Sequence, residues 1–422
     1  MNSHSDTFTI VFLCFLFLTL GLKLWINSRH IRHILRHRGQ TPPEFAHKIS
    51  LEAHQKAAAY TIAKTKLGLI LMFINACVLL GFTIFGGLQW LSVTMLGWFG
   101  PGYLYQIGLV FGFSFLTALI DLPGDYYNQF VLEEKFGFNK MGLGLWLRDL
   151  FAHTALGVAL GLPLLWAILY LMAQAGSLWW LYAWLVFTGF MLFMQIIFPT
   201  FIAPLFNKFT PLEEGELRQS IEGLMQRTGF TANGLFVVDG SKRSAHSNAY
   251  FAGLGAKKRV VFYDTLIAQL SQAEIIAVLA HELGHFKLRH VLKLLAMTSL
   301  SSLAFFFVLG WLKDQVWFYQ GLGVQALPVA HVNDAMALLL FMLVLPVFTF
   351  ALQPLLSRSS RKHEYEADAF AAQHASADDL ISSLVKMYEE NAATLTPDPI
   401  HSMFYDSHPP AALRIAHLRA QA

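Results

Sequence analysis

Two histidines that flank a glutamate are the residues of this sequence best placed to do chemistry. His281, Glu282 and His285 form the pattern His-Glu-x-x-His. Residues four apart on a helix lie on one face, about 5–6 Å from each other, so both imidazoles could bind a single Zn²⁺ ion. The glutamate lies near the same face and could take a proton from water that the metal activates. The pattern predicts one zinc ion per chain, with Glu282 as general base.

A catalytic zinc site also needs a third protein ligand and one open position. The best candidate lies in the segment 361–370, where Glu364 and Asp368 are one turn apart on the same face of a predicted helix. We predict that Glu364 binds the metal and that Asp368 accepts a hydrogen bond from the far nitrogen of a zinc-bound histidine. Taken alone, this segment is more typical of a solvated charged helix. The presence of the His-Glu-x-x-His motif elsewhere in the sequence favours the interpretation of Glu364 as a ligand.

Neighbouring side chains are weaker candidates for the metal. His290 comes nine residues after His281, about half a turn round a continuous helix, and is expected to face away. His363 is displaced by about 100° from Glu364, and Glu366 points away from the ligand face. Three further histidines lie among arginines, on a surface expected to face solvent or lipid headgroups: His30, His33 and His37. Cys14 and Cys77 lie in apolar stretches and are expected to be buried hydrophobes.

The motif has a predicted helix to carry it, inside a region of mixed α/β character. Ser271 and Glu274 have the spacing of a capping box, which predicts that a helix begins there and runs through the motif. Residues 212–228 have a helical pattern. Leu235–Val238 and Arg259–Tyr263 are rich in β-branched and aromatic residues and predict two short strands.

Composition indicates that much of the surface of the protein faces lipid. Of 422 residues, 55% are hydrophobic and only 14% are charged, well below the share in soluble domains. A span needs about 20 apolar residues, and we predict seven spans: 8–26, 67–91, 103–123, 154–174, 178–203, 291–312 and 335–353. The net charge of +3 and the lack of a long basic run give no support to nucleic-acid binding.

The positive charges predict the topology. Nearly all of the 30 Lys and Arg residues fall in alternate loops, and the other loops hold only Lys313. By the positive-inside rule the N-terminus faces outside and the C-terminus faces the cytoplasm. The first span has no Lys or Arg before it and no cleavage site after it, which favours an uncleaved signal anchor.

This topology divides the chain into four parts. Residues 1–203 hold spans one to five with their cytoplasmic loops, and residues 291–353 hold spans six and seven. Residues 204–290 carry the His-Glu-x-x-His helix, and residues 354–422 carry the third ligand, His408 and Arg414. The two polar regions are both cytoplasmic, so we expect them to meet and form one protease domain.

Further sequence blocks carry a resemblance to a known family. They are Leu122-Pro123, 127–139, 204–212, 241–251, 407–410 and Arg414, in addition to the His-Glu-x-x-His motif. With these blocks the chain resembles the type I CAAX prenyl endopeptidases, seven-span zinc metalloproteases of the gluzincin type, and their bacterial relatives. The resemblance implies a multi-pass α-helical membrane protein whose spans enclose a chamber, with a mixed α/β thermolysin-like zinc metalloprotease domain.

The resemblance also implies roles for individual residues. Asn248 and Ala249 correspond to the edge-strand pair that holds the substrate backbone in thermolysin-like enzymes. His408 corresponds to the histidine that donates to the oxyanion of the tetrahedral intermediate. Arg414 corresponds to an arginine that supports the site by pairing with a carboxylate.

The predicted function is therefore zinc-dependent hydrolysis of peptide bonds in prenylated CAAX-type or membrane-associated substrates, in contact with membrane lipid. The alternative is a broad-specificity protease for membrane-protein quality control, without a prenyl requirement. An intramembrane site-2 protease would carry its motif inside a span. A transporter or channel would not explain a zinc constellation in a cytoplasmic domain, and a non-catalytic zinc scaffold would have no use for Glu282. The chain is short and lacks a C-terminal di-lysine signal, which favours the bacterial inner membrane over the endoplasmic reticulum.

Overall fold

Seven helical stretches form the membrane part of the protein. The computed structural model describes residues 3–232, 234–252, 259–327 and 332–421. Within these ranges, the stretches long and apolar enough to cross a membrane are Ser3–His37, Leu51–Phe82, Tyr103–Phe136, Leu143–Gln174, Gly176–Phe206, His290–Leu312 and Asp334–His374. Each contains most of one of the predicted spans, so the prediction of seven spans is confirmed.

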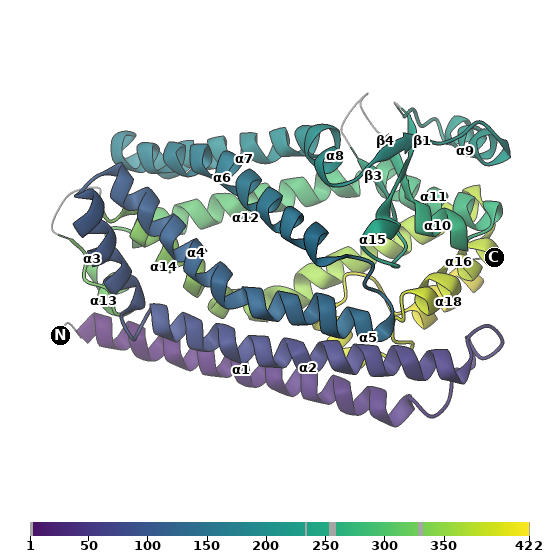
Figure 1. Cartoon of the computed structure of the whole chain (residues 1–422), viewed down its shortest axis with the longest axis horizontal. Helices are drawn as coiled ribbons and strands as arrows, with labels where there is room; N and C mark the ends of the chain where they lie inside the picture. Colours follow the sequence, from purple (N-terminus) through teal and green to yellow (C-terminus); the bar gives the residue numbers. More distant parts are fainter. Residues whose placement is uncertain (1–2, 233, 253–258, 328–331, 422) are drawn as a thin grey trace.

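The membrane helices lie in two groups, with a small domain at one end (Figure 1). Helices α1 (Ser3–His37) and α2 (Leu51–Phe82) run side by side along one edge, and α6 (Leu143–Gln174), α7 (Trp179–Ile197) and α12 (His290–Leu312) lie along the other. Between them are α4 (Tyr103–Tyr127) and α14 (Asp334–Thr349). A cavity of about 680 Å³ lies among α1, α2, α4 and α14.

The second predicted span differs from the helix that forms. The apolar run predicted a span over 67–91, but α2 ends at Phe82 and a separate helix, α3 (Gly87–Phe99), follows a turn. Gly86 has a left-handed backbone with φ of +79°, a conformation that glycine adopts without steric cost. A Cβ atom on Gly87 would lie 2.7 Å from the carbonyl oxygen of Gly81, so the chain folds back tightly there. Hydropathy could not separate the two helices because both are apolar.

The domain outside the membrane helices contains a four-stranded sheet in the order β1-β2-β4-β3. Strands β2 (Leu235–Val238) and β4 (Arg259–Tyr263) are parallel and match the two predicted strands. Strand β3 (Ala249–Ala252) pairs antiparallel with β4 and forms one edge, and β1 (Phe209–Pro211) forms the other. Sequence reasoning missed β1, which has only three residues and ends in proline.

The helix that carries the His-Glu-x-x-His motif is α11 (Gln272–Lys287), which begins at the predicted capping box. The Ser271 side chain accepts from the Glu274 backbone N–H, and the Glu274 carboxylate accepts from the Ser271 N–H at 2.8 Å. Lys386 donates to the same carboxylate at 2.7 Å. The capping bonds satisfy backbone N–H groups at the start of the helix, and the lysine compensates the charge of the glutamate. The rest of the helix is largely buried in the domain core.

A close helix crossing brings the third predicted ligand to α11. Helix α15 (Gln353–His374) follows α14 after a single 3₁₀ turn and packs along α11. At the crossing, a Cβ atom added to Gly284 would lie 3.0 Å from the Ala367 Cα and 3.1 Å from the Phe370 Cβ. Glycine at position 284 therefore lets the two helix backbones approach directly, next to His285 on one helix and Glu364 on the other.

The remaining short helices complete the described part of the chain. They are α5 (Glu134–Phe136), α8 (Ala203–Phe206), α9 (Glu216–Arg227), α10 (Asp264–Gln269), α13 (Val316–Gln320), α16 (Ala377–Glu390), α17 (Pro399–Tyr405) and α18 (Ala411–Arg419). The two polar regions of the sequence thus meet, because α16 packs against both α11 and α18.

Replacing Gly284 by alanine should weaken this crossing. The added methyl group meets backbone atoms of Ala367 at 3.0–3.1 Å, and overpacking of this kind costs about 1–3 kcal/mol. We expect Gly284→Ala to lower the melting temperature in detergent. The matched control is Gly223→Ala in α9, where the nearest atom is an Arg227 side-chain nitrogen at 3.6 Å. That variant should be as stable as wild type or more so, and equal melting of the two variants would contradict the crossing argument.

Candidate metal centre and active site

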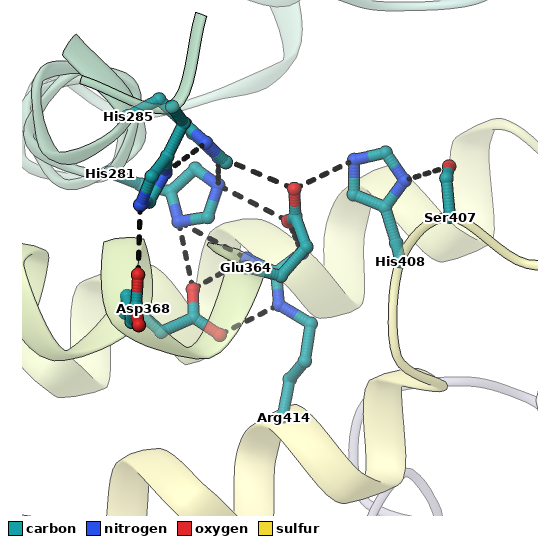
Figure 2. A network of polar contacts seen from close by, with 9 residues as sticks. His281, His285, Glu364, Asp368, Ser407, His408 and Arg414 are labelled. Carbon is teal, nitrogen blue, oxygen red and sulfur yellow. Dashed lines mark hydrogen bonds and ion pairs between the residues drawn. The ribbon is translucent and has the colours of Figure 1, made fainter. Parts of the chain in front are cut away.

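Three predicted metal ligands converge where α11 crosses α15 (Figure 2). The Nε2 atoms of His281 and His285 are 3.2 Å apart. The carboxylate of Glu364 lies 3.4 Å from the first of these nitrogens and 3.3 Å from the second. All three residues thus point one potential ligand atom at the same small volume.

These separations fit a metal ion. Ligand atoms bound at ~2.0–2.1 Å in a tetrahedral arrangement lie about 3.3 Å from one another, close to the separations found here. The Glu364 Oε2 atom is buried and accepts no hydrogen bond from the described residues. A buried carboxylate oxygen without such a bond is costly, and a cation between the three side chains would satisfy it.

The electrostatics of the site also favour positive charge at its centre. Burial lowers the pKa of His281, but the neighbouring carboxylates of Asp368 and Glu364 outweigh that effect and raise the pKa to about 9. The two carboxylates thus stabilise a second proton, and with it positive charge, on this imidazole. A bound cation would take the place of that proton and satisfy the same two carboxylates.

Behind the predicted ligands, Asp368 and Arg414 form a buried ion pair. The Asp368 carboxylate lies 2.8 Å from the His281 Nδ1 atom, on the far side of the ring from the ligand nitrogen. Arg414 donates to both carboxylate oxygens, from Nε at 2.8 Å and from Nη2 at 2.6 Å. Asp368 is fully buried, and the bidentate arginine compensates its charge. The aspartate in turn holds the His281 ring in one orientation.

The predicted general base faces a cavity next to the ligands. Glu282 lines a cavity of about 400 Å³ together with Asn248, Ala249, His408 and Arg414. Burial raises the pKa of the Glu282 carboxyl, against the opposing effect of the two motif histidines. A carboxylate with a raised pKa is a better proton acceptor near neutral pH than an ordinary glutamate.

The start of the predicted backbone-binding strand lines the same cavity. Ala249 is the first residue of β3, which pairs with β4 on one side and forms the edge of the sheet on the other. The exposed Asn248 precedes it and accepts from its N–H through the side-chain oxygen at 2.8 Å. An edge strand in this position can add an extended peptide through main-chain hydrogen bonds.

His408 reaches the centre from the loop between α17 and α18. Its Nε2 atom lies 3.4 Å from the Glu364 carboxylate, and its Nδ1 atom lies 2.9 Å from the Ser407 hydroxyl. The side chain is 61% exposed, so it can meet a bound peptide. All nine residues singled out in the sequence therefore lie around one centre.

The expectation that His290 faces away from the motif is wrong. Helix α11 ends at Lys287, and Arg289 takes a left-handed conformation with φ of +58° before α12 begins. This break turns the His290 ring back, and its Nδ1 atom lies 3.0 Å from the Nδ1 atom of His285. Glu366, as expected, stays away from the ligand atoms and instead contacts His290 at 2.9 Å. The sequence lacks the glycine or asparagine that usually announces such a turn.

Fold and site together define a class of protein. Seven membrane-spanning helices, a small mixed sheet and a two-histidine, one-glutamate cluster beside an edge strand are the features of a multi-span membrane metalloendopeptidase. Comparison with known families gives the particular one. Residues 30–208 match the five-membrane-helix N-terminal region of CAAX prenyl proteases, and residues 211–422 match peptidase family M48. The chain belongs to peptidase family M48.

Individual relatives match along nearly the whole chain. The chain is 35% identical to CAAX prenyl protease 1 of Saccharomyces cerevisiae over 400 residues, with 89% of this chain and 88% of the relative covered. It is 31% identical to the human CAAX prenyl protease 1 homolog over 436 residues, covering 92% and 90% of the two chains. A crystal structure of S. mikatae Ste24p matches with a TM-score of 0.91 and 31% identity, covering 97% of this chain and 99% of that one.

The comparisons confirm the class predicted from the sequence. The protein is a metalloendopeptidase that acts on peptide or protein substrates, and it is an integral membrane protein with several spans. Its fold, with seven apolar helices and a small mixed sheet, is that of the matched crystal structure.

Removing the carboxylate behind His281 should weaken metal binding without abolishing it. In Asp368→Ala the imidazole loses the acceptor at its Nδ1 atom, and such losses raise the metal dissociation constant by ~10–100-fold. Chelator competition in detergent measures this constant. Asp378→Ala, which removes an exposed carboxylate at the start of α16, should bind metal like wild type. An unchanged dissociation constant in Asp368→Ala would contradict the orienting role.

Proposed function

We propose that the protein is a zinc-dependent endopeptidase that hydrolyses prenylated CAAX-type or membrane-associated protein substrates. The observation that carries the proposal is the convergence of three ligand atoms within 4.8 Å of one another, beside a glutamate and an edge strand in one cavity. Peptide-bond hydrolysis by a metalloenzyme needs these parts together: a metal, a base and a means of holding the peptide.

His281, His285 and Glu364 are the proposed ligands of one zinc ion. Two imidazoles and one carboxylate are a common ligand set for catalytic zinc, and the spacing of the three atoms supports tetrahedral binding. When bound, zinc supplies Lewis acidity to the scissile carbonyl and to the attacking water. Asp368 and Arg414 keep His281 in the orientation that presents its Nε2 atom to the site.

Glu282 is the proposed proton carrier. It takes a proton from the attacking water and later delivers it to the leaving amine. Glu282 is half-buried and lies beside both motif histidines. This position supports the role, because the attacking water has to lie between the glutamate and the peptide carbonyl.

His408 and β3 are the proposed contacts to the substrate. His408 donates from its imidazole to the carbonyl oxygen on which negative charge develops. The Asn248–Ala249 edge holds the peptide backbone extended, so that the scissile bond lies across Glu282. The shared 400 Å³ cavity supports this arrangement.

The membrane side of the site supports a lipid-bearing substrate. A second cavity, of about 830 Å³, adjoins Glu282 and His285 and extends along the membrane helix α12. Its walls are mainly apolar and include Phe286, Leu294 and Met297. The relatives named above are called CAAX prenyl proteases, and an isoprenoid is apolar enough to be favoured in such a cavity. Membrane lipid is the other proposed partner.

We propose that the catalytic domain lies on the cytoplasmic side. The Lys and Arg residues of the loops on that side support this orientation through the positive-inside rule. The compartment stays a prediction of the sequence, with the bacterial inner membrane favoured.

The role of Glu282 predicts a variant that binds metal but does not turn over. Glu282→Gln keeps the size of the side chain but cannot accept the proton, so we expect kcat to fall by at least ~10²–10⁴-fold with unchanged metal content and melting temperature. The matched control, Glu213→Gln, changes an exposed glutamate and should keep full activity. Retained turnover in metal-replete Glu282→Gln protein would rule out this role.

The substrate class is tested with a pair of peptides. We expect the purified protein to cleave a farnesylated CAAX peptide, to leave its unprenylated twin largely intact, and to lose activity with a zinc chelator. Restoring zinc should restore cleavage. Equal cleavage of both peptides would favour the broad-specificity protease, while activity that survives complete metal removal would sink the metalloenzyme mechanism.

A further inference from the structure

A line of contacts leads away from the second motif histidine on the side opposite the proposed metal. The Nδ1 atom of His285 lies 3.0 Å from the Nδ1 atom of His290. The Nε2 atom of His290 lies 2.9 Å from the Oε2 atom of Glu366. No step of the proposed mechanism uses His290 or Glu366, and neither side chain offers an atom to the His281–His285–Glu364 cluster.

For a neutral His290 ring, hydrogen-bonding rules give one arrangement of the protons on this line. A carboxylate only accepts, so the His290 Nε2 atom carries the hydrogen that it donates to Glu366. In a neutral ring the other nitrogen then has a free electron pair, so the His290 Nδ1 atom accepts. Its partner, the His285 Nδ1 atom, must therefore donate. That leaves the His285 Nε2 atom with its electron pair facing the proposed metal.

We propose that His290 and Glu366 are positioning residues that set the tautomer and ring orientation of His285, an inference that rests on His285 being a metal ligand. His281 has the same arrangement in a shorter form, with Asp368 directly on its Nδ1 atom. The two histidine ligands would then be held by two separate carboxylates, one in direct contact and one through an intervening imidazole.

The surroundings keep this line in place. His290 is buried, with only 4% of its surface exposed, so its ring contacts other side chains of the protein rather than solvent. The Lys293 and Lys362 ammonium groups lie 4.0 Å and 3.7 Å from the Glu366 carboxylate and hold it beside His290. The His363 ring stacks on His290 at 4.1 Å with planes 13° apart, which fixes the His290 ring without a hydrogen bond to it.

A second metal ion is the competing explanation of the same residues. His290, His363 and Glu366 each offer a potential ligand atom, and these atoms lie within 4.8 Å of one another. Imidazoles bind metals along a lone pair in the ring plane at ~2.0–2.1 Å. Two nearly parallel rings stacked 4.1 Å apart cannot both direct such a lone pair at one ion. The stacking therefore favours the hydrogen-bonded line over a second site.

The test measures zinc affinity of the full-length protein in detergent by chelator competition. In His290→Leu the His285 Nδ1 atom loses its acceptor, and we expect the zinc dissociation constant to rise by ~10–100-fold. His290→Gln restores both an acceptor oxygen and a donor N–H, so its affinity should lie close to that of wild type. The absorption spectrum of the Co²⁺-substituted protein should change in His290→Leu and recover in His290→Gln.

The matched control is His363→Phe. Phenylalanine can keep the stacking on His290 but cannot bind a metal, so zinc affinity and a stoichiometry of one ion per chain should not change. Two ions per chain in wild type, one of them lost in His363→Phe, would overturn the proposal in favour of a second site. Wild-type affinity in a folded His290→Leu protein would overturn the proposal alone, whereas a wild-type protein that binds no zinc would remove the proposed function as well.

Discussion

The close crossing of α11 and α15 is the constraint on which the candidate centre depends. Gly284 lies between the two parts of the motif, and the backbone of α15 at Ala367 occupies the space that a side chain would need. Because the helices touch there, Glu364 and Asp368 reach the front and the back of His281 from the same neighbouring helix. A wider separation would take the Glu364 carboxylate, which is buried, away from both motif histidines, so the close packing of the helices also serves the electrostatics of the site.

Both helices of this crossing are tied to the membrane. Helix α11 leads through Leu288 and Arg289 into α12, and α15 follows α14 after one short turn. The ligand-bearing helices are therefore extensions of the last two spans, held by a buried apolar cluster at one end and by the domain core at the other. The sheet, in contrast, supplies none of the three proposed ligands and contributes the edge along which a peptide can lie.

The sequence predicted those features that depend on short, contiguous stretches of residues. The spans follow from apolar runs, the start of α11 follows from Ser271 and Glu274, and the pairing of Glu364 with Asp368 follows from helix periodicity. It failed where a turn lacks its usual residue. Arg289 is left-handed without being glycine or asparagine, so the assumption of a continuous helix misplaced His290. The end of α2 was missed for a different reason: the turn contains the usual glycine, Gly86, but lies inside an apolar run that reads as one span.

The position of β3 at the edge of the sheet has a consequence for what can be cut. An edge strand binds through main-chain N–H and C=O groups, which every residue except proline offers in full. In a segment already folded into a helix or a sheet, those groups are hydrogen-bonded within the fold. In the proposed binding mode, the edge discriminates between conformations more strongly than between sequences: a chain terminus that can unravel would be accepted, while the same residues inside a stable fold would not.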